Sequence, residues 1–115
     1  MVLLLNDLEQ FAQMALQDFD RGFGENTRAV GEDLERQAQR LEAKLEQLYA
    51  VAATMARRED SLEGVVAIWA RMVSICDRMS ETLSGLRRGP ESCLDSYDRV
   101  LDIRNACEDN RALHA

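Results

Sequence analysis

Two long stretches of the chain place apolar residues at alternating spacings of three and four, and this pattern constrains the fold more than any other feature. The spacing runs 4-3-4-3-4-3 from Leu34 to Met55 and 3-4-3-4-3-4-3 from Leu62 to Leu86. Heptad spacing of this kind gathers apolar side chains on one stripe of an α-helix, which must then pack against another helix. The pattern predicts an all-α fold. The stripe residues are Leu34, Ala38, Leu41, Leu45, Leu48, Ala52 and Met55, then Leu62, Val65, Trp69, Met72, Cys76, Met79, Leu83 and Leu86.

Capping and turn residues extend the pattern to four helices. Asn6 with Glu9 three residues later resembles a capping box, Gly22 and Gly24 are typical of a helix end, and Pro90 suits a first helical turn. The predicted helices span about residues 7–21, 27–58, 61–87 and 90–113. Short connections make neighbouring helices antiparallel. We expect one domain over residues 1–115, an elongated antiparallel three- to four-helix bundle with coiled-coil-like heptad packing.

The first and last predicted helices have apolar faces of their own. The first comprises Leu8, Phe11, Ala12, Ala15, Leu16 and Phe19, and the last comprises Cys93, Leu94, Tyr97, Val100, Leu101, Ile103 and Cys107. Together the four faces supply an aliphatic core for a chain that is 46% hydrophobic but only 5% aromatic.

Composition also argues against several classes of partner. The chain has a formal net charge of −7, and an acidic protein of this kind repels the phosphate backbone of nucleic acids. Its longest charge-free stretch, residues 47–56, is far shorter than the ~20 residues that span a bilayer. Three cysteines, an odd number without CxxC spacing, do not suggest a disulfide framework. We therefore expect neither nucleic-acid nor membrane binding, and a cytoplasmic location, with the nucleus as the alternative.

The residues that usually carry catalysis or bind metals are scarce. The single histidine, His114, is the penultimate residue, where it cannot anchor a catalytic triad or a histidine-based metal site. Asp95, Asp98 and Asp102 share one helix face, which we interpret as solvated because Arg99 and Arg104 alternate with them. We expect no catalytic residue, no metal site and no cofactor.

The cysteines are predicted to be free, buried thiols. If the last two helices pair antiparallel about the turn near Arg88, Cys76 lies roughly level with Asp102, about five residues from the level of Cys107. That offset corresponds to ~7–8 Å along the helix axis, too far for comfortable bridging. Cys93 and Cys107 lie on the same helix, about 21 Å apart.

An uneven distribution of apolar residues suggests where a partner could dock. Residues 48–56 carry no charge on any face, and the helix opposite begins with the apolar run 65–70. A first helix folded back about Gly24 would bring Leu5 only to the level of Lys44, leaving this region open. The alternative is that residues 1–5 extend the first helix and cover it, or that the helices shift. The predicted partner-binding residues are Tyr49, Val51, Val66, Ile68 and Val73.

These expectations favour a non-enzymatic interaction protein. We expect a subunit or adaptor of a larger complex that acts through helix-on-helix packing, with a partner that offers an amphipathic helix or with self-association. The alternative is a small secretion-type or holding chaperone that binds a client segment in an apolar groove. A bundle enclosing an apolar ligand is a third hypothesis, disfavoured because few polar groups converge on the core.

Overall fold

A computed structural model of the protein describes the backbone of residues 5–25, 32–84 and 91–114, and within them the side chains of residues 5–19, 36–84 and 95–114. The described residues form four helices and no strands, which confirms the predicted all-α bundle. The helices are α1 (Leu5–Glu25), α2 (Glu32–Arg58), α3 (Leu62–Ser84) and α4 (Glu91–His114). The predicted helix start at residue 27 and the predicted helix end at residue 87 lie outside the described residues.

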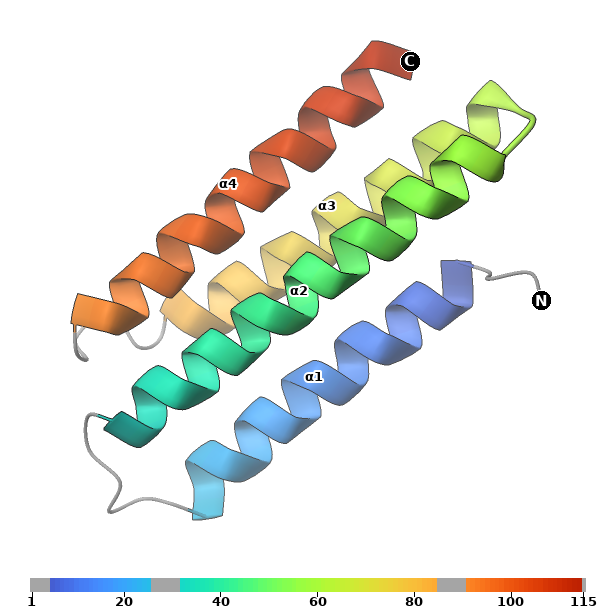
Figure 1. Ribbon diagram of the computed structural model, residues 1–115. Coiled ribbons are helices and arrows are strands. Elements are labelled where there is room, and N and C mark those ends of the chain that lie inside the picture. Colours follow the sequence, from blue (N-terminus) through green and yellow to red (C-terminus); the bar gives the residue numbers. More distant parts are fainter. Residues whose placement is uncertain (1–4, 26–31, 85–90, 115) are drawn as a thin grey trace.

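The four helices form a flattened bundle with α2 and α3 in the middle (Figure 1). Helix α1 lies on one side of this central pair and α4 on the other, and within the described residues these two outer helices do not pack against each other. The Cα atoms extend over 49 × 26 × 16 Å. Each central helix packs against neighbours on two sides, whereas each outer helix leaves one side open.

The heptad stripes of the two central helices form most of the core. On α2 the stripe is buried from Ala38 to Ala52, and on α3 it is buried from Val65 to Leu83. Helix α3 also buries Ile68 and Ile75, which flank its stripe, because it packs against all three other helices. Ile68, predicted as a partner-binding residue, is only 4% exposed and belongs to the core.

Two residues of the predicted stripes and faces are exposed to solvent instead of buried in the core. Leu62 is 67% exposed, because it is the first residue of α3. Ser61 caps this helix end, since the amide of Gly64 donates a hydrogen bond to Ser61 Oγ at 2.9 Å. Phe11 on α1, predicted on the core face, is 55% exposed.

The predicted end of the first helix is also wrong. Helix α1 continues through Gly22 and Gly24 to Glu25. Each glycine costs a helix about 1 kcal/mol relative to alanine, which weakens a helix but does not by itself end it. The hairpin between α1 and α2 therefore turns later in the chain than the glycines suggest.

The register between α3 and α4 differs from the predicted pairing as well. The thiols of Cys76 and Cys107 are within hydrogen-bonding reach of each other, so the predicted offset of five residues between them is wrong. An ion pair supports the observed register, since Arg104 Nε lies 2.7 Å from Asp77 Oδ1.

Candidate functional site

An apolar hollow on the surface lies between α1 and α2, and we call it the α1–α2 groove. It has a volume of about 270 Å³. Each helix contributes four side chains at positions i, i+3, i+4 and i+7, which is one helix face. They are Phe11, Met14, Ala15 and Asp18 from α1, and Lys44, Gln47, Leu48 and Val51 from α2.

Buried residues form the floor of this groove and exposed ones form its wall. Ala15 and Leu48 belong to the core, whereas Phe11 and Met14 are 55% and 59% exposed. Val51 is half-buried at the side of α2. Large apolar side chains exposed next to each other, with charged residues at one end, are characteristic of protein-binding sites.

Helix α1 is positioned by its own core face and by ion pairs to α3. Leu8, Ala12 and Phe19 enter the core, which turns the neighbouring positions 11 and 14 toward solvent. The carboxylate of Glu9 pairs with Arg78 and lies 3.6 Å from Arg71. These pairs attach α1 to α3 as well as to α2.

The register of α1 against α2 corrects the expectation that the first helix stops short. Because Phe11 and Val51 line the same groove, as do Asp18 and Lys44, α1 runs beside the apolar half of α2. Leu5, which was expected level with Lys44, lies well beyond that level and packs against the core. The alternative in which the helices shift is the one that the structure supports.

The structure distributes the predicted partner-binding residues over several places. Tyr49 faces α4, where its hydroxyl accepts a hydrogen bond from Asn110 Nδ2 at 3.1 Å. Its ring centroid lies 5.4 Å from that of Trp69. Val66 lines a hollow at the end of the bundle, and Val73 is half-buried against the core. Of the five predicted residues, only Val51 lines the α1–α2 groove.

Sequence reasoning missed Phe11 and Met14 as surface residues. Phe11 was assigned to the core, and Met14 was assigned to no face. The available signal is that positions 11, 12, 14, 15 and 16 are all apolar, an arc too wide for one outer helix to bury.

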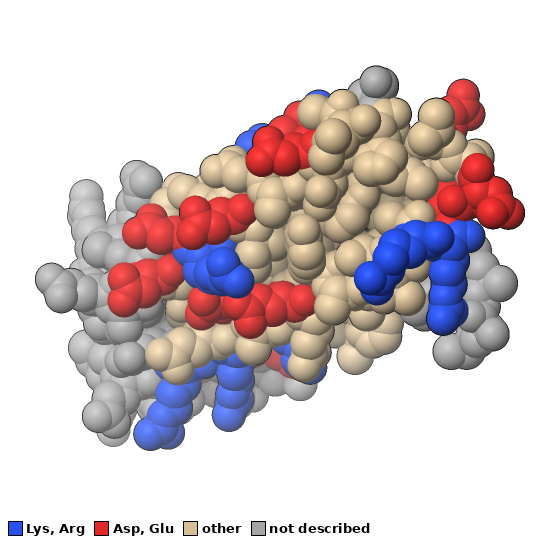
Figure 2. Space-filling view, turned by 45° about the horizontal axis from the view of Figure 1, so that its top comes forward, with Lys and Arg blue, Asp and Glu red and all other residues tan. Residues whose placement is uncertain are grey.

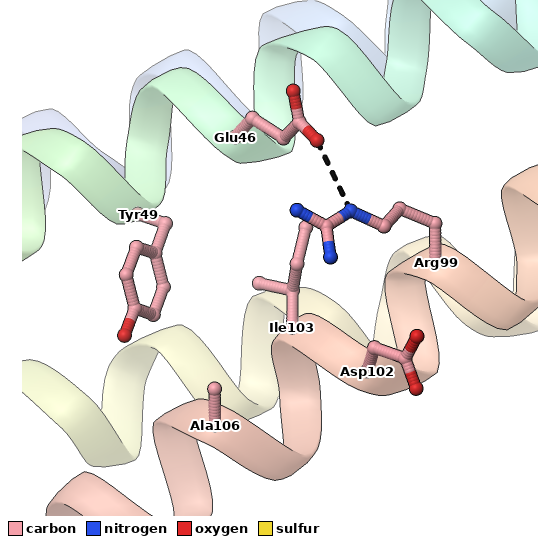
Figure 3. A pocket seen from close by; sticks show the side chains of 6 residues that line it. All are labelled: Glu46, Tyr49, Arg99, Asp102, Ile103 and Ala106. Atoms are coloured by element: carbon pink, nitrogen blue, oxygen red, sulfur yellow. Dashed lines mark hydrogen bonds and ion pairs between the residues drawn. The ribbon is translucent and has the colours of Figure 1, made fainter.

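A second hollow, of about 400 Å³, lies between α2 and α4 and is more polar (Figure 3). Glu46 and Arg99 point toward each other across it, with Arg99 Nε 3.1 Å from Glu46 Oε1. Tyr49 projects from α2, and Ile103 and Ala106 project from α4. Because the two charged groups pair with each other and both are about half exposed, this hollow offers little to anchor a ligand.

The aspartates of α4 and the charged surface agree with a solvated face. Asp95, Asp98 and Asp102 are all exposed. On the face shown in Figure 2, basic side chains stand in separate groups, several of them beside acidic ones, around a broad uncharged area. His114 is exposed too, with Nδ1 2.9 Å from the carbonyl oxygen of Asn110.

Among the described residues, no group of three or more His, Cys, Asp or Glu side chains is placed to hold a metal ion. None of the helices over the same residues combines the length and the apolar character that crossing a membrane requires.

Compared with known proteins, the chain matches no protein-family model, no curated protein and no solved structure.

Proposed function

We propose that this protein is a non-enzymatic interaction subunit or adaptor that binds other proteins by helix-on-helix packing at the α1–α2 groove. The observation that carries the proposal is the exposure of Phe11 and Met14 over a floor made by Ala15 and Leu48. Two helices with a shallow apolar trough between them accept the ridge of a third helix.

The energetics favour a docked state for these side chains. Removing an aliphatic or aromatic side chain from water is worth about 1.5–3 kcal/mol when burial is complete. Phe11, Met14 and Val51 are all only partly buried, so a partner helix can still bury much of their surface. Part of that gain offsets the loss of translational and rotational freedom, and the remainder stabilises the complex.

The test compares two variants: one places a negative charge inside the groove, and the other places the same charge just outside it. Met14→Glu puts a carboxylate among apolar side chains, whereas Gln13→Glu adds the same group at the next, exposed position of α1, which does not line the groove. We expect Met14→Glu to weaken binding of native partners at least about tenfold, with unchanged helicity by circular dichroism, and Gln13→Glu to bind like the wild type. Equal partner retention by both variants would place the interface elsewhere.

A holding chaperone is the second candidate function, and the composition of the groove favours it. Met14 has a flexible, polarisable thioether that adapts to different client side chains. The stripe on each helix spans eight residues and is about 10 Å long, which suits a short client segment. A chaperone would suppress aggregation of several unrelated clients and release them, whereas a subunit would retain one partner at fixed stoichiometry.

A further inference from the structure

We infer that the α1–α2 groove binds the same groove of a second copy of this chain, related by a twofold axis that runs along the groove. The inference rests on the proposed function, since it assumes that the groove binds helices, and it specifies which helices these are. The order of charged and apolar side chains along the two helices favours this partner.

Charged and apolar side chains occupy opposite ends of the groove. Because α1 and α2 are antiparallel, Asp18 and Lys44 meet at one end and Phe11 and Val51 at the other. Met14, Ala15, Gln47 and Leu48 lie between these ends. Each end thus carries one residue from each helix, with opposite charges at one end and apolar side chains at the other.

This order is self-complementary for a single orientation of two facing grooves. A twofold axis along the groove lays α1 of each copy on α2 of the other and keeps the charged ends together. Asp18 of each copy then faces Lys44 of the other, and Phe11 of each faces Val51 of the other. The same ion pair therefore forms twice, at the edge of a central apolar layer.

The other orientation of facing grooves is disfavoured by the same residues. A twofold axis across the groove would lay Asp18 and Lys44 of one copy on Phe11 and Val51 of the other. Charged groups would then lose water without gaining a partner, which costs free energy. The order of charged and apolar side chains therefore favours a second copy as the partner and also selects the direction of the twofold axis.

Asp18 and Lys44 are available for contacts between copies. Neither forms an ion pair with another described residue of its own chain. By contrast, Glu9, Glu46, Asp77 and Glu108 all pair with arginines of their own chain. The groove therefore has charges of both signs where a second copy would supply their partners.

The experiment measures association of the full chain by sedimentation velocity over a range of concentrations. The contact spans about two helical turns of each helix, a small interface, so we expect a wild-type dimer that dissociates in the micromolar range. Asp18→Lys leaves two positive groups at the charged end of each copy, and Lys44→Asp leaves two negative groups there, so like charges face each other in either dimer. Each variant alone should dimerise at least tenfold more weakly than the wild type.

Mixing the two variants is the decisive measurement. With the axis along the groove, each positive group of Asp18→Lys meets a negative group of Lys44→Asp, so the equimolar mixture should recover dimer at near wild-type affinity. Asp18→Asn and Lys44→Gln are the controls; their mixture restores only one of the two ion pairs, so it should recover much less. Gln13→Glu should dimerise like the wild type.

Three results would overturn the inference. The first is a wild-type chain that stays monomeric at about 1 mM. The second is a dimer that persists in Met14→Glu and in both charge-reversal variants. The third is an equimolar mixture of the two charge-reversal variants that forms no dimer. A monomeric wild type whose binding to another protein is lost in Met14→Glu would leave the proposed function standing while overturning self-association. If Met14→Glu changes neither dimerisation nor the binding of another protein, both the self-association and the proposed function are overturned.

Discussion

The thiol of Cys76 on α3 lies beside the thiol of Cys107 on α4 inside the bundle, within hydrogen-bonding reach. Both cysteines are free and fully buried. The hydrogen bond to Cys107 and burial together raise the pKa of the Cys76 thiol well above its ordinary value. Since the thiolate is the reactive form of cysteine, Cys76 is protected both sterically and chemically.

We therefore predict that Cys76 and Cys107 react with thiol reagents only when the bundle unfolds. The side chain of Cys93 lies outside the described residues, so the measurement uses a Cys93→Ser background. At pH 8, titration with a chromogenic disulfide should find almost no reactive thiol in native protein and both thiols in denaturant. Rapid labelling of native protein would contradict the buried pair, and absence of thiols in denaturant would reveal a disulfide.

Glu42 on α2 provides a prediction about pH. Burial raises the pKa of its carboxyl, and Glu46 raises it further, while a hydrogen bond from Ser96 Oγ at 3.4 Å lowers it. A carboxyl whose pKa is higher in the folded state favours folding below its unfolded pKa of about 4.3, and that contribution is lost as the pH rises. The ionised group therefore costs stability at pH 7.

Glu42→Gln should increase the free energy of unfolding at pH 7 and have little effect at pH 3.5. The side chain is only half-buried, so solvent screening limits the gain to roughly 0.2–0.5 kcal/mol. Urea denaturation at the two pH values measures it, with Glu81→Gln on the exposed side of α3 as the control that removes a solvated carboxylate. A gain of the same size at both pH values would show that the carboxylate charge of Glu42 is not its cause.

The ion pair between Glu9 and Arg78 joins α1 to α3 and should contribute measurably to stability. Their side chains are 22% and 35% exposed, between a surface pair and a buried one. A double-mutant cycle with Glu9→Ala and Arg78→Ala should give a coupling energy of about 1 kcal/mol. Gln10→Ala, at the next, exposed position of α1, should show no coupling to Arg78→Ala. A coupling energy near zero for the Glu9 cycle would mean that core packing alone positions α1.

The heptad pattern was sufficient to predict which faces of the central helices are buried. Ala38, Leu45 and Ala52 on α2, like Met72 and Met79 on α3, are buried where the spacing places them. Burial of a stripe depends on the side chains of that stripe, which are a local property of the sequence, and it requires only that some helix lies against the stripe, in any register.

The same pattern could not predict how far each helix is shifted along its neighbour. A stripe that repeats every seven residues presents nearly the same apolar surface after sliding by one heptad, so several registers bury similar areas. The contact of Cys76 with Cys107 depends on this choice, and so does the position of Phe11 beside Val51 in the α1–α2 groove. Ion pairs such as Arg104 with Asp77 distinguish the registers, but charged residues on every helix offer many alternative pairs.

Comparison of Phe11 with Leu8 separates a docking residue from a core residue on the same helix. Leu8 is fully buried, so Leu8→Ala leaves a cavity and should lower the free energy of unfolding by about 2–5 kcal/mol. Phe11 is 55% exposed at the rim of the α1–α2 groove, so Phe11→Ala should cost less than about 1 kcal/mol in the monomer. Denaturation followed through the single tryptophan, Trp69, which is buried in the core, measures both.

Phe11→Ala, which should have the smaller effect on stability, should have the larger effect on association of two copies. Phe11→Ala removes the side chain that is expected to pack on Val51 of a second copy, so it should weaken association although the fold remains intact. Measurements at low concentration report the monomer, and measurements at high concentration add the contribution of the dimer. A loss of several kcal/mol for Phe11→Ala at low concentration would mean that this ring stabilises the bundle itself, and the groove would then lose its principal exposed anchor.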